Sequence, residues 1–213
     1  MIRRVEIGKL AYRHGVPERT IQKDYIITCV LRELARVMPS VGLRFKGGTC
    51  LKKCYFADFR FSEDMDFTLE GSAGTEAALE ALEEVERPLL DSYSDAGPSV
   101  TVRCYSLDEI FLEKVVCLLD PKRIQPRDLY DLVQLADGGS VDFQGVAWRF
   151  EQKARFKGLE PARLHDAMVR KSAQLKRAWE MQLAEQLPTG ALPGYEDCER
   201  QMLRLLKKHG FTD

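Results

Sequence analysis

Two glycines and two aspartates are the residues of this sequence best suited to chemistry on a phosphate. Gly47 and Gly48 follow a short apolar segment, and Thr49 adds a hydroxyl group at the next position. Two glycines after a strand let backbone N–H groups approach a phosphate closely, and the start of a following helix adds a favourable dipole. The pattern therefore predicts a turn that binds a phosphate through its backbone, with the Thr49 hydroxyl as a further donor to the same phosphate.

The carboxylates of Asp64 and Asp66 stand two residues apart on a predicted strand, so they point to one face of it. Neighbouring carboxylates repel each other, which raises a pKa unless a cation lies between them. Mg²⁺ prefers oxygen ligands and often bridges to substrate phosphates. A solvent-facing acidic strand end is the plainer interpretation of the pair alone, but the glycine turn one strand earlier favours a metal site.

A second group of charged residues lies further along the chain, around Lys114 and Asp128. Lys114 interrupts the apolar stripe of a predicted helix, and a buried lysine needs an anionic partner, either a carboxylate or a nucleotide phosphate. Asp128 and Asp131 open the next predicted helix as i, i+3 neighbours on one face. Carboxylates in a first helical turn are also ordinary caps, so capping stays open beside function, as does the choice between the two aspartates.

The elements that must position these groups follow from hydrophobic periodicity and from turn residues. The patterns predict strands over residues 43–46, 65–69 and 99–105, with loops over residues 71–74, 120–126 and 187–194. They predict helices within residues 2–38 (one of them over 18–38, stopped by Pro39), over 51–56, 75–94, 107–119 and 127–136, and from 143 to the end. This order indicates an α+β core with a helical C-terminal lobe, divided into residues 1–137 and 138–213.

The composition narrows the function classes. Hydrophobic residues make up 45% of the 213 residues and charged residues 31%, the balance of a soluble globule. No apolar run approaches the roughly 20 residues that span a bilayer, and the first residues lack the apolar core of a secretion signal, so we expect a cytoplasmic protein without a membrane partner. The six cysteines are scattered and are expected to be reduced and mostly buried. The three histidines are far apart, which disfavours a histidine metal site or a Ser-His-Asp triad.

The charge distribution leaves one candidate surface for a polyanion. The formal net charge is −1, which gives no overall electrostatic preference for nucleic acid. Residues 141–178, however, carry nine basic side chains against four acidic ones. This local excess is compatible with a polyanion-facing surface and, more plainly, with a solvated helix face.

Taken together, these motifs resemble motif I and later motifs of the AbiEii-type nucleotidyltransferase toxins, members of the DNA polymerase beta-like superfamily. The motif I resemblance rests on Phe45-Lys46-Gly47-Gly48-Thr49, Lys53 and Arg60-Phe61-Ser62-Glu63-Asp64-Met65-Asp66. Glu113-Lys114 and Arg127-Asp128-Leu129-Tyr130-Asp131 resemble the later lysine and aspartate motifs, and Gln22-Lys23-Asp24-Tyr25 resembles an N-terminal helical signature. The resemblance covers residues 15–137 and implies a small mixed sheet flanked by helices.

What the resemblance implies is metal-dependent transfer of a nucleoside monophosphate from an NTP, with pyrophosphate leaving. The acceptor it implies is RNA, above all the 3′ end of tRNA, and the partner is a cognate antitoxin, often one with a winged-helix DNA-binding domain. By position, Asp64 and Asp66 would bind Mg²⁺, with Mn²⁺ as the alternative ion, and Asp128 would orient or activate the acceptor hydroxyl. The implied nucleotide-binding residues are Lys46, Gly47, Gly48, Thr49, Lys53, Ser62 and Lys114.

The sequence departs from the family pattern at three points. Cys50 stands where a small hydroxyl residue is common, and Gln22 replaces the usual acid. The third predicted strand, residues 99–105, carries no carboxylate, although the wider superfamily has one there. A metal ligand is therefore missing, or Asp128 takes a related role.

Two other functions remain open at this stage. One keeps the fold but changes the reaction to phosphotransfer, or to nucleotidyl transfer onto a protein or small molecule. The other is a helix-turn-helix DNA-binding module, because Ala11, Gly15 and Ile21 have the required spacing. Residues 17–25 would then form the recognition helix, with a reading face made of Arg19, Thr20 and Lys23.

Overall fold

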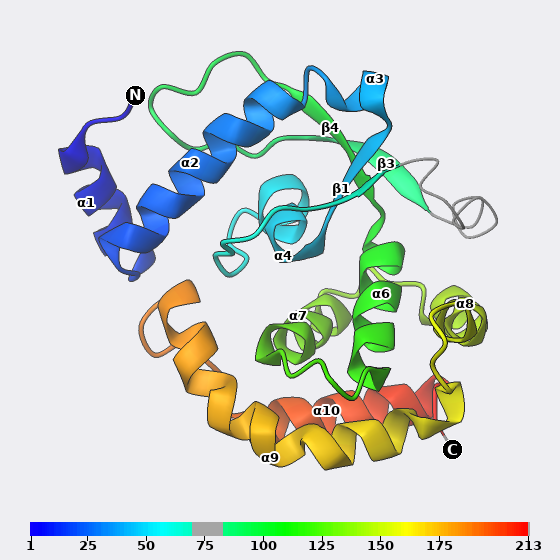
Figure 1. Cartoon of the computed structure of the whole chain (residues 1–213). Helices are drawn as coiled ribbons and strands as arrows, with labels where there is room; N and C mark the ends of the chain where they lie inside the picture. Colours follow the sequence, from blue (N-terminus) through cyan, green and yellow to red (C-terminus); the bar gives the residue numbers. More distant parts are fainter. Residues whose placement is uncertain (70–82, 213) are drawn as a thin grey trace. The chain divides into compact units, whose positions relative to one another are not determined.

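The computed structural model describes residues 1–69 and 83–212 (Figure 1). The chain groups into two compact units. Unit 1 comprises Met1–Tyr105 with Ala184–Ala191, and unit 2 comprises Ser106–Leu183 with Leu192–Asp213. The domain boundary expected after residue 137 falls inside unit 2.

Unit 1 contains a mixed four-stranded sheet with the strand order β2-β1-β4-β3. Its strands are β1 (Leu43–Lys46), β2 (Asp66–Leu69), β3 (Glu84–Pro88) and β4 (Thr101–Tyr105). β1 pairs antiparallel with β2 and parallel with β4, and β3 pairs antiparallel with β4. Phe45, at the centre of β1, is completely buried. The expected α+β class with a small mixed sheet is confirmed.

Helices of unit 1 precede the sheet and follow its first strand (Figure 1). α1 (Arg4–His14) and α2 (Glu18–Leu34) form a hairpin that turns at Gly15, whose φ of 61° is left-handed. α3 (Met38–Val41) leads into β1, and α4 (Gly47–Cys50) continues into the π-helical turn η1 (Leu51–Tyr55). The short η3 (Ala184–Gln186) also belongs to this unit. The helix expected to run from 18 to 38 ends at Leu34, and Pro39 instead lies in the first turn of α3, a position that proline favours.

The acidic helix expected over residues 75–94 is wrong for the part that the structure describes. Residues 84–88 form the edge strand β3, in which Val85 lies opposite Cys104 of β4. Glu84 forms an ion pair with Arg44 of β1, so pairing to distant residues outweighs a helical composition. Pro88 fits an edge strand and would break the interior of a helix. The loop expected over 71–74 and the first part of that helix lie outside the described residues.

Unit 2 is helical. It consists of α6 (Leu107–Leu119), α7 (Pro126–Asp137), α8 (Phe143–Phe156), η2 (Pro161–Arg163), α9 (Leu164–Leu183) and α10 (Tyr195–Lys208). α6 packs against α7, α8 and α9, and most of its apolar side chains are buried. Ser106 begins α6 by accepting the backbone N–H of Glu109, and Asp142 begins α8 in the same way. Pro126 occupies the first position of α7.

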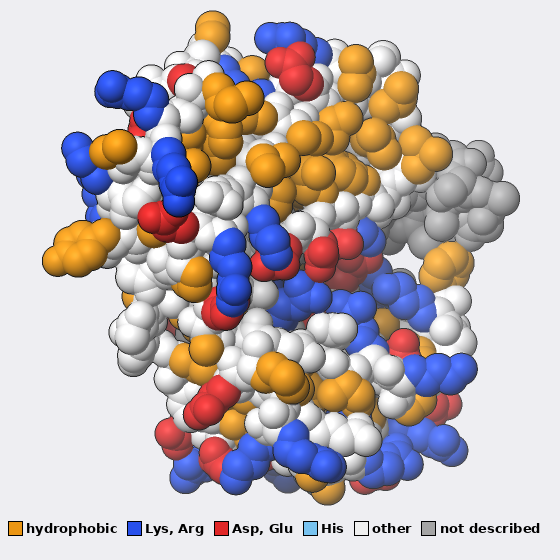
Figure 2. Space-filling model, turned by 60° about the vertical axis from the view of Figure 1, so that its left-hand side comes forward, with side chains coloured by type: hydrophobic (Ala, Val, Ile, Leu, Met, Phe, Trp, Pro, Cys, Tyr) orange, Lys and Arg blue, Asp and Glu red, His pale blue; other side chains and the backbone are white. Residues whose placement is uncertain are grey.

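The surface carries charges of both signs. Figure 2 shows lysine and arginine side chains beside aspartate and glutamate side chains over much of the visible face, in keeping with a net charge of −1. Within the described part of the chain, no helix combines the length and apolar character needed to cross a bilayer.

Candidate active site

The glycine turn lies at the end of β1, beside the first residue of β2. Lys46 of β1 is opposite Asp66 of β2, and the chain then turns at Gly47 with a φ of +81°. A Cβ atom at Gly47 would lie 2.5 Å from Oδ2 of Asp66, so a side chain here would displace the carboxylate. The Lys46 ammonium lies 5.3 Å from the ring centre of Tyr105. The structure therefore brings together the turn and one of the two aspartates proposed from sequence.

The second glycine lies against Arg60. A Cβ atom at Gly48 would lie 2.5 Å from Nη2 of Arg60 and 3.3 Å from Oγ of Ser62. Arg60 is 3% exposed, and its Nη1 donates to Oε1 of Gln186 at 2.8 Å and to the backbone oxygen of Phe61 at 3.1 Å. Arg60 belongs to the motif that ends in Asp64 and Asp66, but the sequence pattern gives it no role of its own. A cation inside an acidic motif was the signal that marked it.

Asp64 and Thr49 are joined through the backbone. The Thr49 hydroxyl, expected to donate to a phosphate, donates to the backbone oxygen of Asp64 and so fixes the segment before β2 against α4. Thr49 is buried, whereas the side chains of Asp64 and Asp66 are both exposed. Two exposed carboxylates two residues apart give a cation oxygen ligands that are open to solvent.

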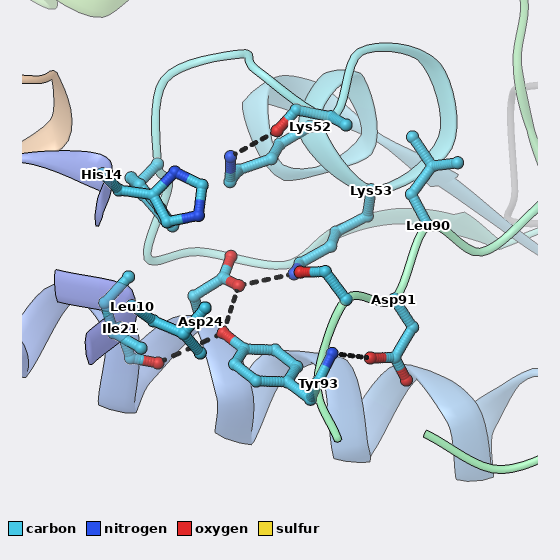
Figure 3. Close-up of a pocket in the computed structure, with 12 residues that line it drawn as sticks. Leu10, His14, Ile21, Asp24, Lys52, Lys53, Leu90, Asp91 and Tyr93 are labelled. Carbon is cyan, nitrogen blue, oxygen red and sulfur yellow. Dashed lines mark hydrogen bonds and ion pairs between the residues drawn. The ribbon is translucent and has the colours of Figure 1, made fainter. Parts of the chain in front are cut away.

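Lys53, proposed as a triphosphate ligand, is buried in an ion pair with Asp24 of α2. Its Nζ lies 2.6 Å from Oδ2 of Asp24, and the hydroxyl of Tyr93 donates to the same oxygen at 2.6 Å (Figure 3). Asp24 and Lys53 are each 4% exposed. Asp24 belongs to the N-terminal helical signature of residues 22–25. Its contact with Lys53 therefore gives this signature a structural role.

The same residues line a pocket of about 220 Å³ in unit 1 (Figure 3). The Nζ atom of Lys52 donates to the backbone oxygens of Ala57 and Phe59, each at 2.9 Å. No carboxylate of the described residues lies within ion-pair distance of Lys52, and burial lowers its pKa to about 8. Burial also lowers the pKa of His14, which faces the pocket from α1.

In unit 2, Lys114 lies between two aspartates of α7. Its Nζ is 2.7 Å from Oδ2 of Asp131 and 3.2 Å from Oδ1 of Asp128. Arg123 completes the group, with Nε 2.7 Å from Oδ2 of Asp128. The anionic partner that a lysine on an apolar stripe requires is therefore a pair of carboxylates.

The charges of this cluster compensate one another. Burial alone would raise the pKa of Asp128, but Lys114 and Arg123 outweigh burial and lower it, so this carboxylate is ionised at neutral pH. Asp131 is fully buried. The structure does not show the capping alternative, because no side chain caps α7 at Gln125, the residue before the helix, and the Asp128 carboxylate instead binds Lys114 and Arg123.

Most of the basic excess in residues 141–178 takes part in contacts within unit 2. Arg149 and Lys153 bind Glu109 on α6, and buried Lys171 donates to the backbone oxygens of Leu118 and Asp120. Arg163, Arg170 and Arg177 are exposed, are spaced seven residues apart, and have no carboxylate within ion-pair distance among the described residues. We call these three arginines the arginine stripe; Arg163 lies on η2, and Arg170 and Arg177 lie about two turns apart on one side of α9.

The reading face of the helix-turn-helix alternative is occupied inside unit 1. α1 and α2 do form a helical hairpin, yet Thr20 is buried and donates to the backbone oxygen of Glu185. Arg19 pairs with the carboxylate of Glu185, and Lys23 lies 2.7 Å from Glu63. These contacts use the side chains that would have to read a base pair.

Comparison with known proteins identifies a family. The family model described as "Nucleotidyl transferase AbiEii toxin, Type IV TA system" matches residues 29–96 and 78–200. Among solved structures, the chain is similar to the crystal structure of JHP933 from Helicobacter pylori, with 15% sequence identity and a TM-score of 0.49 over 91% of this chain and 93% of that chain. No curated protein matches the chain.

Proposed function

Because the chain belongs to the AbiEii family of nucleotidyl transferase toxins, we propose that it transfers a nucleoside monophosphate from an NTP to the 3′ end of a tRNA. An oxygen of the acceptor hydroxyl forms a bond to the α-phosphorus. The bond from that phosphorus to the bridging oxygen breaks, pyrophosphate leaves with the bonding electrons, and the hydroxyl proton passes to a base.

The observation that carries this proposal is the contact between the glycine turn and Asp66. Backbone N–H groups at the end of β1 suit a phosphate, and a carboxylate at the same place suits the cation that accompanies a nucleotide. Gly47 is the residue that allows both, because a Cβ atom there would lie 2.5 Å from the carboxylate oxygen.

Asp64 and Asp66 fit a hard divalent cation. Their carboxylates are exposed and two residues apart, and oxygen donors are what Mg²⁺, or alternatively Mn²⁺, prefers. When bound, such a cation neutralises phosphate charge and polarises the phosphorus–oxygen bond. Among the described residues, no third carboxylate joins the two aspartates within ligand distance, which agrees with the absence of an acidic residue in β4.

Arg60 and Lys53 supply positive charge for the phosphates. Arg60 is held beside Gly48 by buried hydrogen bonds, so its position needs no rearrangement on binding. In this proposal Lys53 stabilises the charge that builds on pyrophosphate, and it exchanges its carboxylate partner Asp24 for a phosphate oxygen.

The arginine stripe supports a polyanionic acceptor. Arg170 and Arg177 lie about 10 Å apart along α9, from a rise of about 1.5 Å per residue, and Arg163 lies on η2 directly before this helix. Exposed guanidinium groups bind phosphates sequence-independently and in a salt-dependent manner. We therefore expect them to bind the RNA backbone rather than the NTP.

The family's place in a type IV toxin–antitoxin system supports a cognate antitoxin as the protein partner. We propose that expression of this chain alone slows bacterial growth and that an antitoxin gene restores it. The same growth assay with Asp66→Asn tests whether transfer causes the toxicity.

The direct test incubates the purified protein with total tRNA, Mg²⁺ and each α-labelled NTP in turn. We expect label on tRNA with one NTP and none with Asp66→Asn. Glu63→Gln is the matched control, because Glu63 is a neighbouring exposed carboxylate that pairs with Lys23. Equal labelling by Asp66→Asn and the wild type would refute the proposed site.

The alternatives give different results in the same assay. Label from a γ-labelled NTP, with none from the α-labelled one, would indicate phosphotransfer. α-Label on protein or on a small molecule, with none on RNA, would keep nucleotidyl transfer and refute the RNA acceptor. A shift of duplex DNA without NTP or metal would favour the helix-turn-helix alternative.

A further inference from the structure

Three buried cysteines converge in unit 1, beside the glycine turn. Cys50 ends α4, Cys54 lies on η1, and Cys104 lies on β4. Their sulfur atoms all lie within 4.8 Å of one another, and none of the three residues is more than 1% exposed. We refer to them as the cysteine cluster.

The local structure explains why these sulfurs meet. Cys50 and Cys54 are four residues apart on a continuous helical segment, so they share a face. Cys104 is paired with Phe45, the residue of β1 that lies two positions before the glycine turn. The cluster thus joins the helix that follows the turn to the strand beside it.

From this geometry we propose that the cysteine cluster binds one soft, thiophilic metal ion, and that the ion is Cu(I). The proposal stands independently of the nucleotidyl transfer reaction. Isolated buried cysteines pack as small apolar residues, but three sulfurs converging from two elements form a donor set. Soft thiolate ligands select Cu(I) and Zn²⁺ over hard cations such as Mg²⁺.

The number of ligands distinguishes copper from zinc. Structural zinc sites take four ligands, at about 2.3 Å for sulfur. Among the described residues, no fourth cysteine, histidine or carboxylate joins this group. Three sulfurs at about 2.3 Å from a common centre lie about 4 Å apart in a plane, a spacing that the cluster reaches with small side-chain movements. Cu(I), a closed-shell ion, readily accepts three thiolates.

The surroundings suit a dry site for a monovalent cation. The thiol of Cys104 donates to the phenolic oxygen of Tyr55 at 3.8 Å, and Nε of Arg87 donates to the backbone oxygen of Cys54 at 3.2 Å. The guanidinium of Arg87 also lies 4.8 Å from the ring centre of Tyr55. A bound Cu(I) ion with three thiolates carries a net negative charge, and Arg87 is a nearby cation that offsets part of it.

The binding test uses reduced protein without oxygen. Cu(I) is supplied as its weak acetonitrile complex against a competing bicinchoninate chelator, and bound copper is read from the near-ultraviolet absorbance of copper–thiolate bonds. We expect one copper per chain. Changes that only touch the outer surroundings of a metal weaken binding about 10–100-fold, so Cys50→Ser or Cys104→Ser should weaken it more than about 100-fold.

Cys198→Ser is the matched control, because Cys198 is also buried but lies on α10 of unit 2. It should bind copper like the wild type. Copper uptake by Cys50→Ser equal to that of the wild type, or no uptake in competition with the chelator, would refute the site.

A second measurement needs no variant and so does not depend on variant folding. The wild-type protein is alkylated in mild denaturant with and without Cu(I), and the modified cysteines are mapped by mass spectrometry. Protection of all three cluster cysteines, with exposed Cys29 and buried Cys198 unprotected, supports the proposal. Equal alkylation with and without Cu(I), or an intramolecular disulfide that forms without copper uptake, contradicts it.

Discussion

Lys114 in unit 2 and the charged groups near the glycine turn in unit 1 have different surroundings. In unit 2, Lys114 is buried against two aspartates, and one of these also binds Arg123. In unit 1, the aspartates beside the glycine turn are exposed. Buried Lys52 donates to two backbone oxygens and lies 4.0 Å from the ring centre of Phe61, with no carboxylate of the described residues within ion-pair distance. Removing one partner of a buried ion pair costs stability, whereas an exposed carboxylate is accessible to a cation. We therefore expect substitutions in the Lys114 cluster to change stability first, and substitutions at the glycine turn to change ligand binding first.

The largest effect should follow from breaking the Lys114 cluster. Lys114→Met leaves Asp128 and Asp131 buried with less compensation, and removing one partner of a buried pair costs about 3–5 kcal/mol. We expect a loss of this size in the free energy of unfolding, measured by urea denaturation. Lys176→Met, which breaks an exposed pair with Glu196, should change stability far less, because solvent screens an exposed pair.

A different outcome would reassign Lys114. If Lys114→Met unfolds like the wild type but loses nucleotidyl transfer, the lysine binds the nucleotide rather than stabilising unit 2. A rise in the KM for the NTP at unchanged stability would give the same answer.

The second effect is a pH dependence of stability at Lys52, which separates this lysine from the ion-paired Lys114. The pKa of Lys52 is about 8 in the folded protein, against a usual value of 10.5. Between these values the unfolded chain binds more protons, so the stability contributed at this position rises with pH. The wild type should gain up to about 3 kcal/mol over Lys52→Met as the pH rises through this window.

Denaturation of both proteins at several pH values from 7 to 10 measures that difference. Lys9→Met is the control, because Lys9 is exposed on α1 and should show a flat difference. A flat difference for Lys52→Met as well would mean that Lys52 is compensated as Lys114 is.

Local patterns predicted the parts of the site that lie close together in sequence. The strand before Gly47, the turn itself and the strand that carries Asp66 follow from alternation and glycine placement within about 25 residues. The lysine on the apolar stripe of α6 indicated an anionic partner, and the structure supplies two aspartates from the next helix. Such contacts are predictable because short connections leave few alternatives.

Contacts between distant residues were not predictable in this way. The pairing of Lys53 with Asp24 joins residues 29 positions apart, and the hydrogen bond from Arg60 to Gln186 spans 126 positions. The composition of residues 84–88 favours a helix, and only their pairing with β4 makes them the strand β3. The convergence of three cysteines likewise depends on the parallel pairing of β1 with β4, which no local pattern encodes.

A third and smaller effect tests the close approach of Asp66 to the turn. Gly47→Ala places a Cβ atom at a φ of +81° and 2.5 Å from Oδ2 of Asp66. We expect a loss of about 1–3 kcal/mol in the free energy of unfolding, and reduced transfer, because strain and displacement of the carboxylate act together. Gly190→Ala is the matched control, since Gly190 has a φ of +79° and no described atom within 4 Å of its Cβ position. Equal losses of stability in both variants would mean that the left-handed backbone conformation is the whole cause and that the contact with Asp66 contributes nothing.

The smallest effect on stability should accompany the loss of an exposed aspartate. Asp66→Asn removes a charge from a solvent-exposed strand end, and surface substitutions usually change stability by less than about 0.5 kcal/mol. Transfer should nevertheless fall about 100- to 1,000-fold, the size of the effect when one preorganised electrostatic contact to a transition state is lost. Urea denaturation and the α-labelled NTP assay on the same preparation measure both quantities. If Asp66→Asn lost stability and transfer in parallel, Asp66 would have a structural role like that of the Lys114 cluster. The expected difference between the exposed carboxylates of unit 1 and the buried charges of unit 2 would then be refuted.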